Sequence, residues 1–162
     1  MSKSEEPDFV ALVKSYQSLS RGQQAEIRRA AEPEALLLLP GFYQLIRKVK
    51  LNPNLQSCRM IWFLPYAEHQ EKAEPLGRLM ANKNVNERRL FQVVRSEYPN
   101  DLINLHRILR QIKSNQNWES FGRLLYYWGQ SKEKSKNSKQ TLMKDYYLKP
   151  EKKEHSKGEN HE

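Results

Sequence analysis

The chain has 162 residues, of which 28 are lysine or arginine and 19 are aspartate or glutamate, so its formal net charge is +9. This length suits one domain with a single core, and the basic charge makes a polyanion the first partner to expect. No run approaches the roughly 20 apolar residues that cross a bilayer, and the first residues lack the apolar stretch of a signal peptide. We therefore expect a cytoplasmic protein without a membrane partner.

Apolar residues recur at helical spacing from residue 8 to residue 148, and no segment shows the sustained alternation of a strand. Asp8, Asn86 and Asn100 are candidate helix N-caps. The predicted helices cover residues 9–19, 21–31, 42–49, 55–67, 75–82, 86–96, 101–114, 118–130 and 139–148. The pattern predicts an all-α protein, a compact bundle of about eight to nine short helices.

Two apolar segments are expected to supply much of the core. Residues 55–67 are apolar almost all round, with Pro65 as a point where this central helix kinks or ends. The only cysteine, Cys58, lies in this segment, so an intramolecular disulfide is excluded and a buried structural thiol is expected. The aromatic residues at 126–128 could stack on bases, but their helical spacing favours a core role, with Tyr127 the most exposed.

Two polar segments are expected to lie outside the core. Residues 68–74 carry charge and few apolar side chains, which is typical of an exposed loop. Residues 149–162 contain four lysines and four glutamates and little that could be buried, which predicts a disordered tail. We therefore expect a helical domain at 1–148, which carries the whole net charge, and a polar tail at 149–162.

The positive charge is concentrated between residues 75 and 113, where eight basic residues face three acidic ones, a balance of +5. In the helix predicted at 86–96, Leu90 and Val93 lie on the apolar side, whereas Arg88 and Arg95 project from the opposite side and Arg89 flanks them. The helix predicted at 101–114 is expected to carry a second basic row along its flank. This row comprises His106, Arg107, Arg110 and Lys113.

The sequence lacks the patterns that common enzyme classes require. The four histidines have no ligand-type spacing with one another or with Cys58, and there is no glycine-rich phosphate loop, dinucleotide fingerprint or nucleophile elbow. The acidic residues mostly neighbour basic ones, as Glu87 does Arg88. We expect no enzymatic activity, no metal, no cofactor and no small-molecule substrate.

Three segments, taken in order, resemble the CasB family, the small subunit of the type I-E CRISPR Cascade surveillance complex. They are AEIRRAAEPEALLLLPGFYQLI at residues 25–46, LGRLMANKNVNERRLFQVVRSEYPNDLINLHRILRQI at 76–112 and WESFGRLLYYWG at 118–129. No single motif is specific to the family, but the ordered set is. The resemblance covers nearly everything from Phe9 to Leu148, and the acid-containing loop at 68–74 and the tail depart from the family pattern.

The resemblance implies a non-catalytic, all-α subunit of a prokaryotic antiviral complex. Its implied partners are crRNA, both strands of a target-DNA R-loop, the backbone and large Cascade subunits, and a second copy of itself. The positions that match the basic pattern of the family are Arg28, Arg29, Arg78, Arg89, Arg95 and Arg107. Arg88, Arg110 and Lys113 join this nucleic-acid-binding set from the helix-face analysis alone.

Two other functions fit a basic helical protein. A DNA-binding transcriptional regulator of the helix-turn-helix kind would need base-reading side chains on a recognition helix, where this chain has mostly arginine. An adaptor would instead use its arginines on acidic protein surfaces. Sequence-independent DNA binding separates the first alternative from our hypothesis, and nuclease treatment of co-purified complexes separates the second.

Overall fold

The computed structural model describes residues 6–148, a chain of α-helices joined by short links. The α-helices are α1 (Phe9–Gln17), α2 (Arg21–Arg28), α3 (Pro40–Val49), α4 (Leu55–Phe63), α5 (Leu76–Asn82), α6 (Glu87–Arg95), α7 (Asn100–Ile112), α8 (Trp118–Tyr127) and α9 (Lys132–Tyr147). Two 3-10 helices, η2 (Pro33–Leu38) and η3 (Leu64–Tyr66), complete the set. Residues 6–148 contain no β-strand beyond an isolated bridge between His69 and Gln116. The all-α prediction is confirmed, whereas the tail predicted to be disordered lies outside the described residues.

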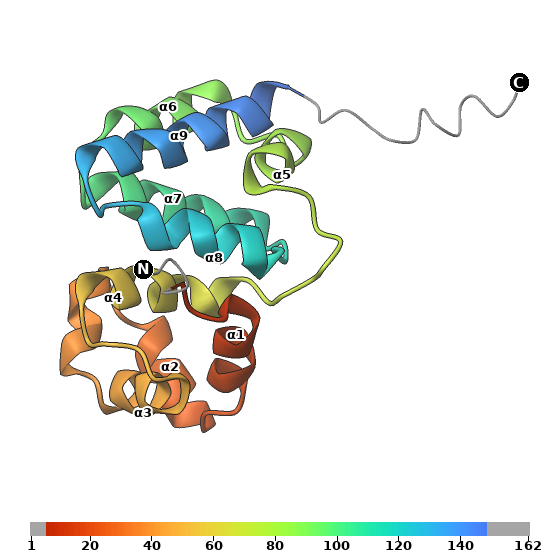
Figure 1. Ribbon diagram of the computed structural model, residues 1–162. Coiled ribbons are helices and arrows are strands. Elements are labelled where there is room, and N and C mark those ends of the chain that lie inside the picture. Colours follow the sequence, from red (N-terminus) through yellow and green to blue (C-terminus); the bar gives the residue numbers. More distant parts are fainter. Residues whose placement is uncertain (1–5, 149–162) are drawn as a thin grey trace, which may run out of the picture.

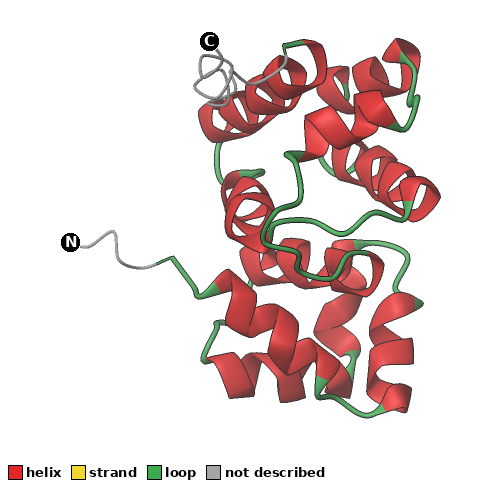
Figure 2. Cartoon of the chain, turned by 90° about the vertical axis from the view of Figure 1, so that its right-hand side faces the viewer, coloured by secondary structure: helices red, strands yellow, loops and turns green. Residues whose placement is uncertain are grey.

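The helices form two groups that meet in the middle of the molecule. Figure 1 shows α1 to α4 at one end and α5 to α9 at the other, and Figure 2 shows the same division after a quarter turn. Helices α4 and α1 pack against α8, which joins the two groups. Within the second group, α6 packs against α7 and α5 against α9, with α9 and α8 passing in front of α6 and α7 in Figure 1.

Side-chain caps fix where several helices begin. Asp8 accepts a hydrogen bond from the backbone N–H of Ala11, and Asn86 accepts one from that of Arg89, as both were predicted to do. Asn100 does not cap α7 but is its first residue, following Pro99, so that prediction was wrong. Ser131 caps α9, which begins seven residues earlier than expected.

The expected long core helix is interrupted at Pro65. Helix α4 ends at Phe63 and continues as η3, because proline has no N–H for the helical ladder and its ring crowds the preceding turn. Every residue of α4 from Ser57 to Phe63 is buried, which confirms its central place. Cys58 is among them, and burial raises the pKa of its thiol to about 11, as expected of a structural cysteine.

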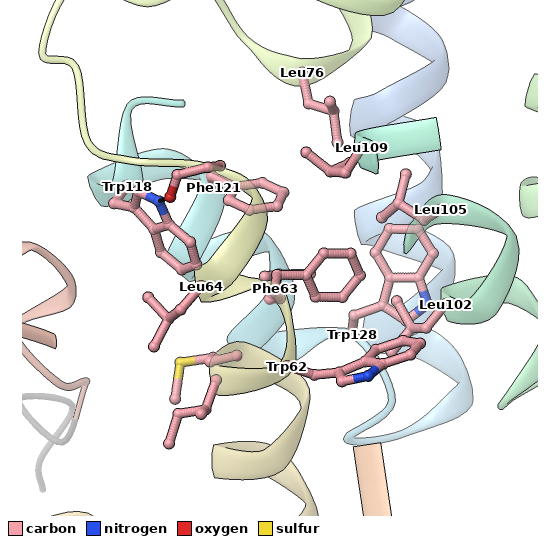
Figure 3. Close-up of a cluster of buried hydrophobic side chains, with 14 of the residues drawn as sticks. Trp62, Phe63, Leu64, Leu76, Leu102, Leu105, Leu109, Trp118, Phe121 and Trp128 are labelled. Carbon is pink, nitrogen blue, oxygen red and sulfur yellow. Dashed lines mark hydrogen bonds between the residues drawn. The ribbon is translucent and has the colours of Figure 1, made fainter. Parts of the chain in front are cut away.

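Aromatic side chains from the two groups of helices pack together at the centre (Figure 3). Phe63 of α4 meets Phe121 of α8 edge to face, with ring centres 5.8 Å apart. All three buried tryptophans donate a hydrogen bond from the indole N–H. Trp62 donates to the carbonyl of Ala30 at 2.8 Å, Trp118 to the carbonyl of Ala67 at 2.9 Å, and Trp128 to the carboxylate of Asp101 at 2.9 Å. These bonds give the apolar core a fixed arrangement because an unpaired buried N–H would be unfavourable.

Close backbone contact fixes α5 on α9. A β-carbon added at Gly77 would lie 2.7 Å from the backbone nitrogen of Tyr146, too near for any residue but glycine. The next residue, Arg78, donates from Nη2 to the carbonyl of Tyr146 at 2.9 Å. The seven-residue α5 is therefore held by residues of α9 that lie more than 60 positions later in the chain.

A candidate nucleic-acid interface on helices α6 and α7

Helix α6 presents two arginines to solvent because its apolar side packs against the core. Leu90 and Val93 are completely buried, and Arg88 and Arg95 lie on the opposite, exposed side, as the helical spacing predicted. The guanidinium of Arg95 lies over the ring of Phe91, 4.5 Å from its centre. The face analysis of this helix is confirmed.

Polar contacts along the seam between α6 and α7 bring arginines of the two helices together. Arg89 of α6 donates a hydrogen bond to the side chain of Gln111 of α7. Nearer the other end of the seam, Asn104 donates to the carbonyl of Gln92 and accepts from Arg107, both at 3.4 Å. The structure therefore places Arg89 and Arg107 on one continuous surface.

The C-terminal end of α7 extends this surface toward α2. Arg110 and Lys113 are exposed and line a hollow of about 440 Å³ together with Tyr66 of η3. The hydroxyl of Tyr66 donates to the carbonyl of Arg28 at 3.1 Å, which anchors the end of α2 beside this hollow. Arg28 and Arg29 are both exposed there.

We call five arginines of the two helices, together with Lys113 directly after α7, the α6–α7 basic face. They are Arg88, Arg89, Arg95, Arg107, Arg110 and Lys113. Within residues 6–148 three ion pairs form at 4.0 Å or less, and none of them involves this face, Arg28 or Arg29. These charges are therefore not neutralised by carboxylates of the described part of the chain.

Arg78, the remaining predicted site residue, is not on this surface. Its side chain is buried, with the residue 9% exposed, and it bonds to the backbone of α9 as described above. The sequence pattern could not reveal this, because the residue that covers Arg78 lies on a helix distant in the chain. Arg78 holds α5 and α9 together rather than facing solvent.

His106 was expected on the basic flank of α7, and the structure shows that this was wrong. The residue is 4% exposed, and its ring stacks on Trp62 with centres 3.7 Å apart. Burial lowers its pKa to about 4, so the imidazole is neutral near pH 7 and its Nε2 lies 3.2 Å from the carbonyl of Trp62. It lies at the edge of the apolar stripe of α7, and the packing of α4 brings it inside.

A further group of lysines on α9 escaped the sequence analysis. Lys132, Lys136 and Lys139 line a hollow of about 770 Å³ that also includes Arg95 of the basic face. Of these, Lys139 lies 3.1 Å from the carboxylate of Asp101, a residue that is only 2% exposed. The available signal was the lysine-rich run between residues 132 and 139, which lacks an apolar stripe and did not indicate a helix.

No group of three or more histidine, cysteine, aspartate or glutamate side chains within residues 6–148 could hold a metal ion. In the same part of the chain, no helix is long and apolar enough to cross a membrane. The fold and the exposed arginines define a small, basic, all-helical protein.

Comparison with known proteins places this chain among CRISPR-associated proteins. The family model for CRISPR-associated protein Cse2 matches residues 6–147, so the chain belongs to that family. The CRISPR system Cascade subunit CasB of Escherichia coli K12 is 34% identical over 158 residues, covering 89% of this chain and 95% of that protein. A chain in the crystal structure of E. coli Cascade bound to a PAM-containing double-stranded DNA target superposes with a TM-score of 0.77 at 32% identity, covering 89% of this chain and 97% of that one. The sequence-based assignment to this family is confirmed.

Proposed function

We propose that this protein is a non-catalytic small subunit of a type I-E Cascade complex that stabilises the crRNA-guided R-loop through contacts between its basic face and DNA phosphates. Its partners are the other Cascade subunits, a second copy of itself, crRNA and the target DNA. The proposal rests on two properties of the E. coli relative. That protein is a Cascade subunit, and the E. coli Cascade complex binds a PAM-containing double-stranded DNA target.

The single observation that carries the proposal is the α6–α7 basic face. Five arginines and a lysine lie on two neighbouring helices, and no carboxylate of residues 6–148 is paired with them. An unpaired guanidinium keeps its charge at any physiological pH and can bind two phosphate oxygens at once. Arg28 and Arg29 extend the surface through Tyr66. Arg78 is left out of it, because its guanidinium is buried.

Phosphate contacts suit the energetics of an R-loop. Exchange of DNA base pairs for RNA–DNA pairs is nearly balanced, so contacts with the backbone are enough to shift it toward the open state. Such contacts fix the position of a strand without reading its sequence. The guide RNA then supplies specificity, and this subunit supplies affinity.

The test uses Cascade reconstituted with wild-type protein or with Arg89→Ala/Arg107→Ala, assayed for R-loop formation on two unrelated protospacers with matching guides. We expect both targets to lose R-loop stability to the same extent, because the lost contacts are to phosphates. The control Arg47→Ala removes an exposed arginine from α3, at the other end of the molecule, and should have little effect. A loss confined to one protospacer would contradict the proposal and indicate base reading.

Salt dependence gives a second readout on the subunit itself. If about six phosphates of a single strand are neutralised, the logarithm of the binding constant should fall with the logarithm of salt at a slope of about −4. The double variant should lower this slope by about 1.4, since two contacts are lost. A flat salt dependence would exclude phosphate contacts as the source of affinity.

A further inference from the structure

The N-terminal segment is fastened to α8 by one carboxylate. The hydroxyl of Tyr127 donates to Glu6 Oε2 at 2.6 Å, and Arg123 Nε donates to Glu6 Oε1 at 3.1 Å. The bond from Tyr127, followed by the bond from Arg123, holds the pKa of Glu6 below its ordinary value. The same bond raises the pKa of Tyr127 to about 12. Arg123 and Tyr127 thus already form a binding site for an anionic oxygen pair.

This carboxylate is bonded to two residues, Arg123 and Tyr127, that line a groove between α8 and α9. The groove has a volume of about 450 Å³, and its walls combine cationic, hydroxyl, amide and aromatic groups. Lys134 lies over the ring of Tyr127, with Nζ 4.7 Å from the ring centre. The groove therefore has two cations and a partly exposed aromatic ring in one place, the combination found where single-stranded nucleic acid binds.

Glu6 differs from the acids of the other two ion pairs in residues 6–148. Asp101 is buried and pairs with the partly buried Lys139, and Asp145 neighbours Lys144 in the same helix. Glu6 comes from the segment before α1, and the side chains of Glu6 and Arg123 are 27% and 54% exposed. An ion pair this accessible contributes little to stability, so a competing anion can replace the carboxylate.

We infer that the α8–α9 groove is a second binding site for single-stranded nucleic acid, in which a phosphate displaces Glu6 from Arg123 and a base contacts the ring of Tyr127. Lys134 then moves from the ring to a phosphate of the same strand. A nucleic acid fits better than an acidic peptide because the groove offers an aromatic ring and amide and hydroxyl groups beside its cations. The site uses none of the residues of the α6–α7 basic face, so the two proposals can be tested separately.

The first test measures binding of the full-length chain to a labelled oligothymidine at low salt. Glu6→Gln removes the competing charge and should raise affinity about threefold, the size expected for loss of one exposed ion pair. Glu71→Gln, an exposed acid of the 67–75 loop, removes the same charge elsewhere and controls for net charge. Adding Arg123→Ala to Glu6→Gln should abolish the gain.

The second test locates the strand by photocrosslinking an oligonucleotide that carries 5-iododeoxyuridine, followed by peptide mapping. We expect a crosslink at Tyr127 that strengthens in Glu6→Gln and persists in Arg89→Ala/Arg107→Ala, which separates this site from the proposed function. Equal effects of Glu6→Gln and Glu71→Gln, or crosslinks on α6 and α7 alone, would overturn the inference. The inference would also be overturned if Tyr127 did not crosslink to the oligonucleotide but did crosslink to a glutamate-rich peptide that carries a photoreactive group. That result would assign the groove to a protein partner.

Discussion

The α6–α7 basic face and the helices α8 and α9 each carry six lysines and arginines, yet they differ in how these charges are satisfied. All three ion pairs of residues 6–148 use a cation of α8 or α9, whereas the α6–α7 basic face has none. The comparison teaches that a count of basic residues does not identify a polyanion site. Within residues 6–148, the cations of the α6–α7 basic face meet a polyanion without a competing carboxylate, whereas in the α8–α9 groove a strand must first displace Glu6 from Arg123.

The largest effect is expected where a cation of α9 has a structural role. Lys139→Met leaves the carboxylate of Asp101 buried with only the Trp128 N–H as a side-chain partner, which should lower the free energy of unfolding by about 3 kcal/mol. Urea unfolding measures this, with the exposed Lys136→Met as the matched control. Equal stability of the two variants would show that Asp101 does not depend on Lys139.

The next largest effect is the loss of stability at low pH that follows from the burial of His106 on the core side of α7. His106 has a folded-state pKa of about 4 against an ordinary value of 6.5, so the unfolded chain binds a proton more readily. Its contribution to stability is therefore complete above pH 6.5 and is lost as the pH falls toward 4. Between pH 7 and pH 5 the loss should be about 2 kcal/mol.

His106→Asn supplies the reference for this measurement, because the carboxylates titrate alike in both proteins. The difference in unfolding free energy between the wild type and the variant should shrink as the pH falls. If His106 instead belonged to the basic face, acidification to pH 5.5 would strengthen DNA binding in the wild type and not in the variant.

A smaller effect distinguishes the buried arginine from the exposed ones. Arg78→Ala removes the hydrogen bond to Tyr146 and side-chain packing between α5 and α9, which should lower stability by about 1–2 kcal/mol. DNA affinity, measured at a temperature where the variant is folded, should change little. A loss of affinity as large as that of Arg89→Ala would place Arg78 in the interface after all.

The smallest stability effect is expected on the basic face itself. Arg88→Ala should change the unfolding free energy by less than about 0.5 kcal/mol, because the side chain is exposed and makes no ion pair. The same variant should weaken DNA binding and lower the salt slope by about 0.7. Thermal unfolding and fluorescence anisotropy on one preparation give both values. If Arg88→Ala lowered stability and left DNA binding unchanged, Arg88 would have a structural role and would not belong to the DNA-binding surface.

Periodicity predicted much of this fold because most helices bury a regular stripe. In α1, Phe9, Leu12, Val13 and Tyr16 recur at helical spacing, and all four are buried. The start of α9 was missed because its first turns, from Lys132 to Lys136, bury no apolar side chain, and only the Ser131 cap marks the boundary. A helix whose first turns lie at the surface leaves little trace in a hydrophobic pattern.

The exposed arginines were predicted more reliably than the polar residues that turned out to be buried. Arg88 and Arg95 lie opposite a broad apolar arc, so the geometry of one helix determines their exposure. Asp101 and His106 are buried by contacts with α9 and α4, which no local pattern encodes. Tertiary partners therefore decided which polar side chains of α7 became part of the core.

The backbone contact at Gly77 has a consequence for where the chain can be shortened. Because α5 rests on Leu142, Asp145 and Tyr146 through a position without a side chain, its seat is provided by the last two turns of α9. A stop codon before residue 142 would remove this support, although residues 142–148 contribute only one fully buried side chain, that of Leu142. The last turns of α9, a mostly hydrophilic helix, thus hold in place α5, which lies much earlier in the sequence.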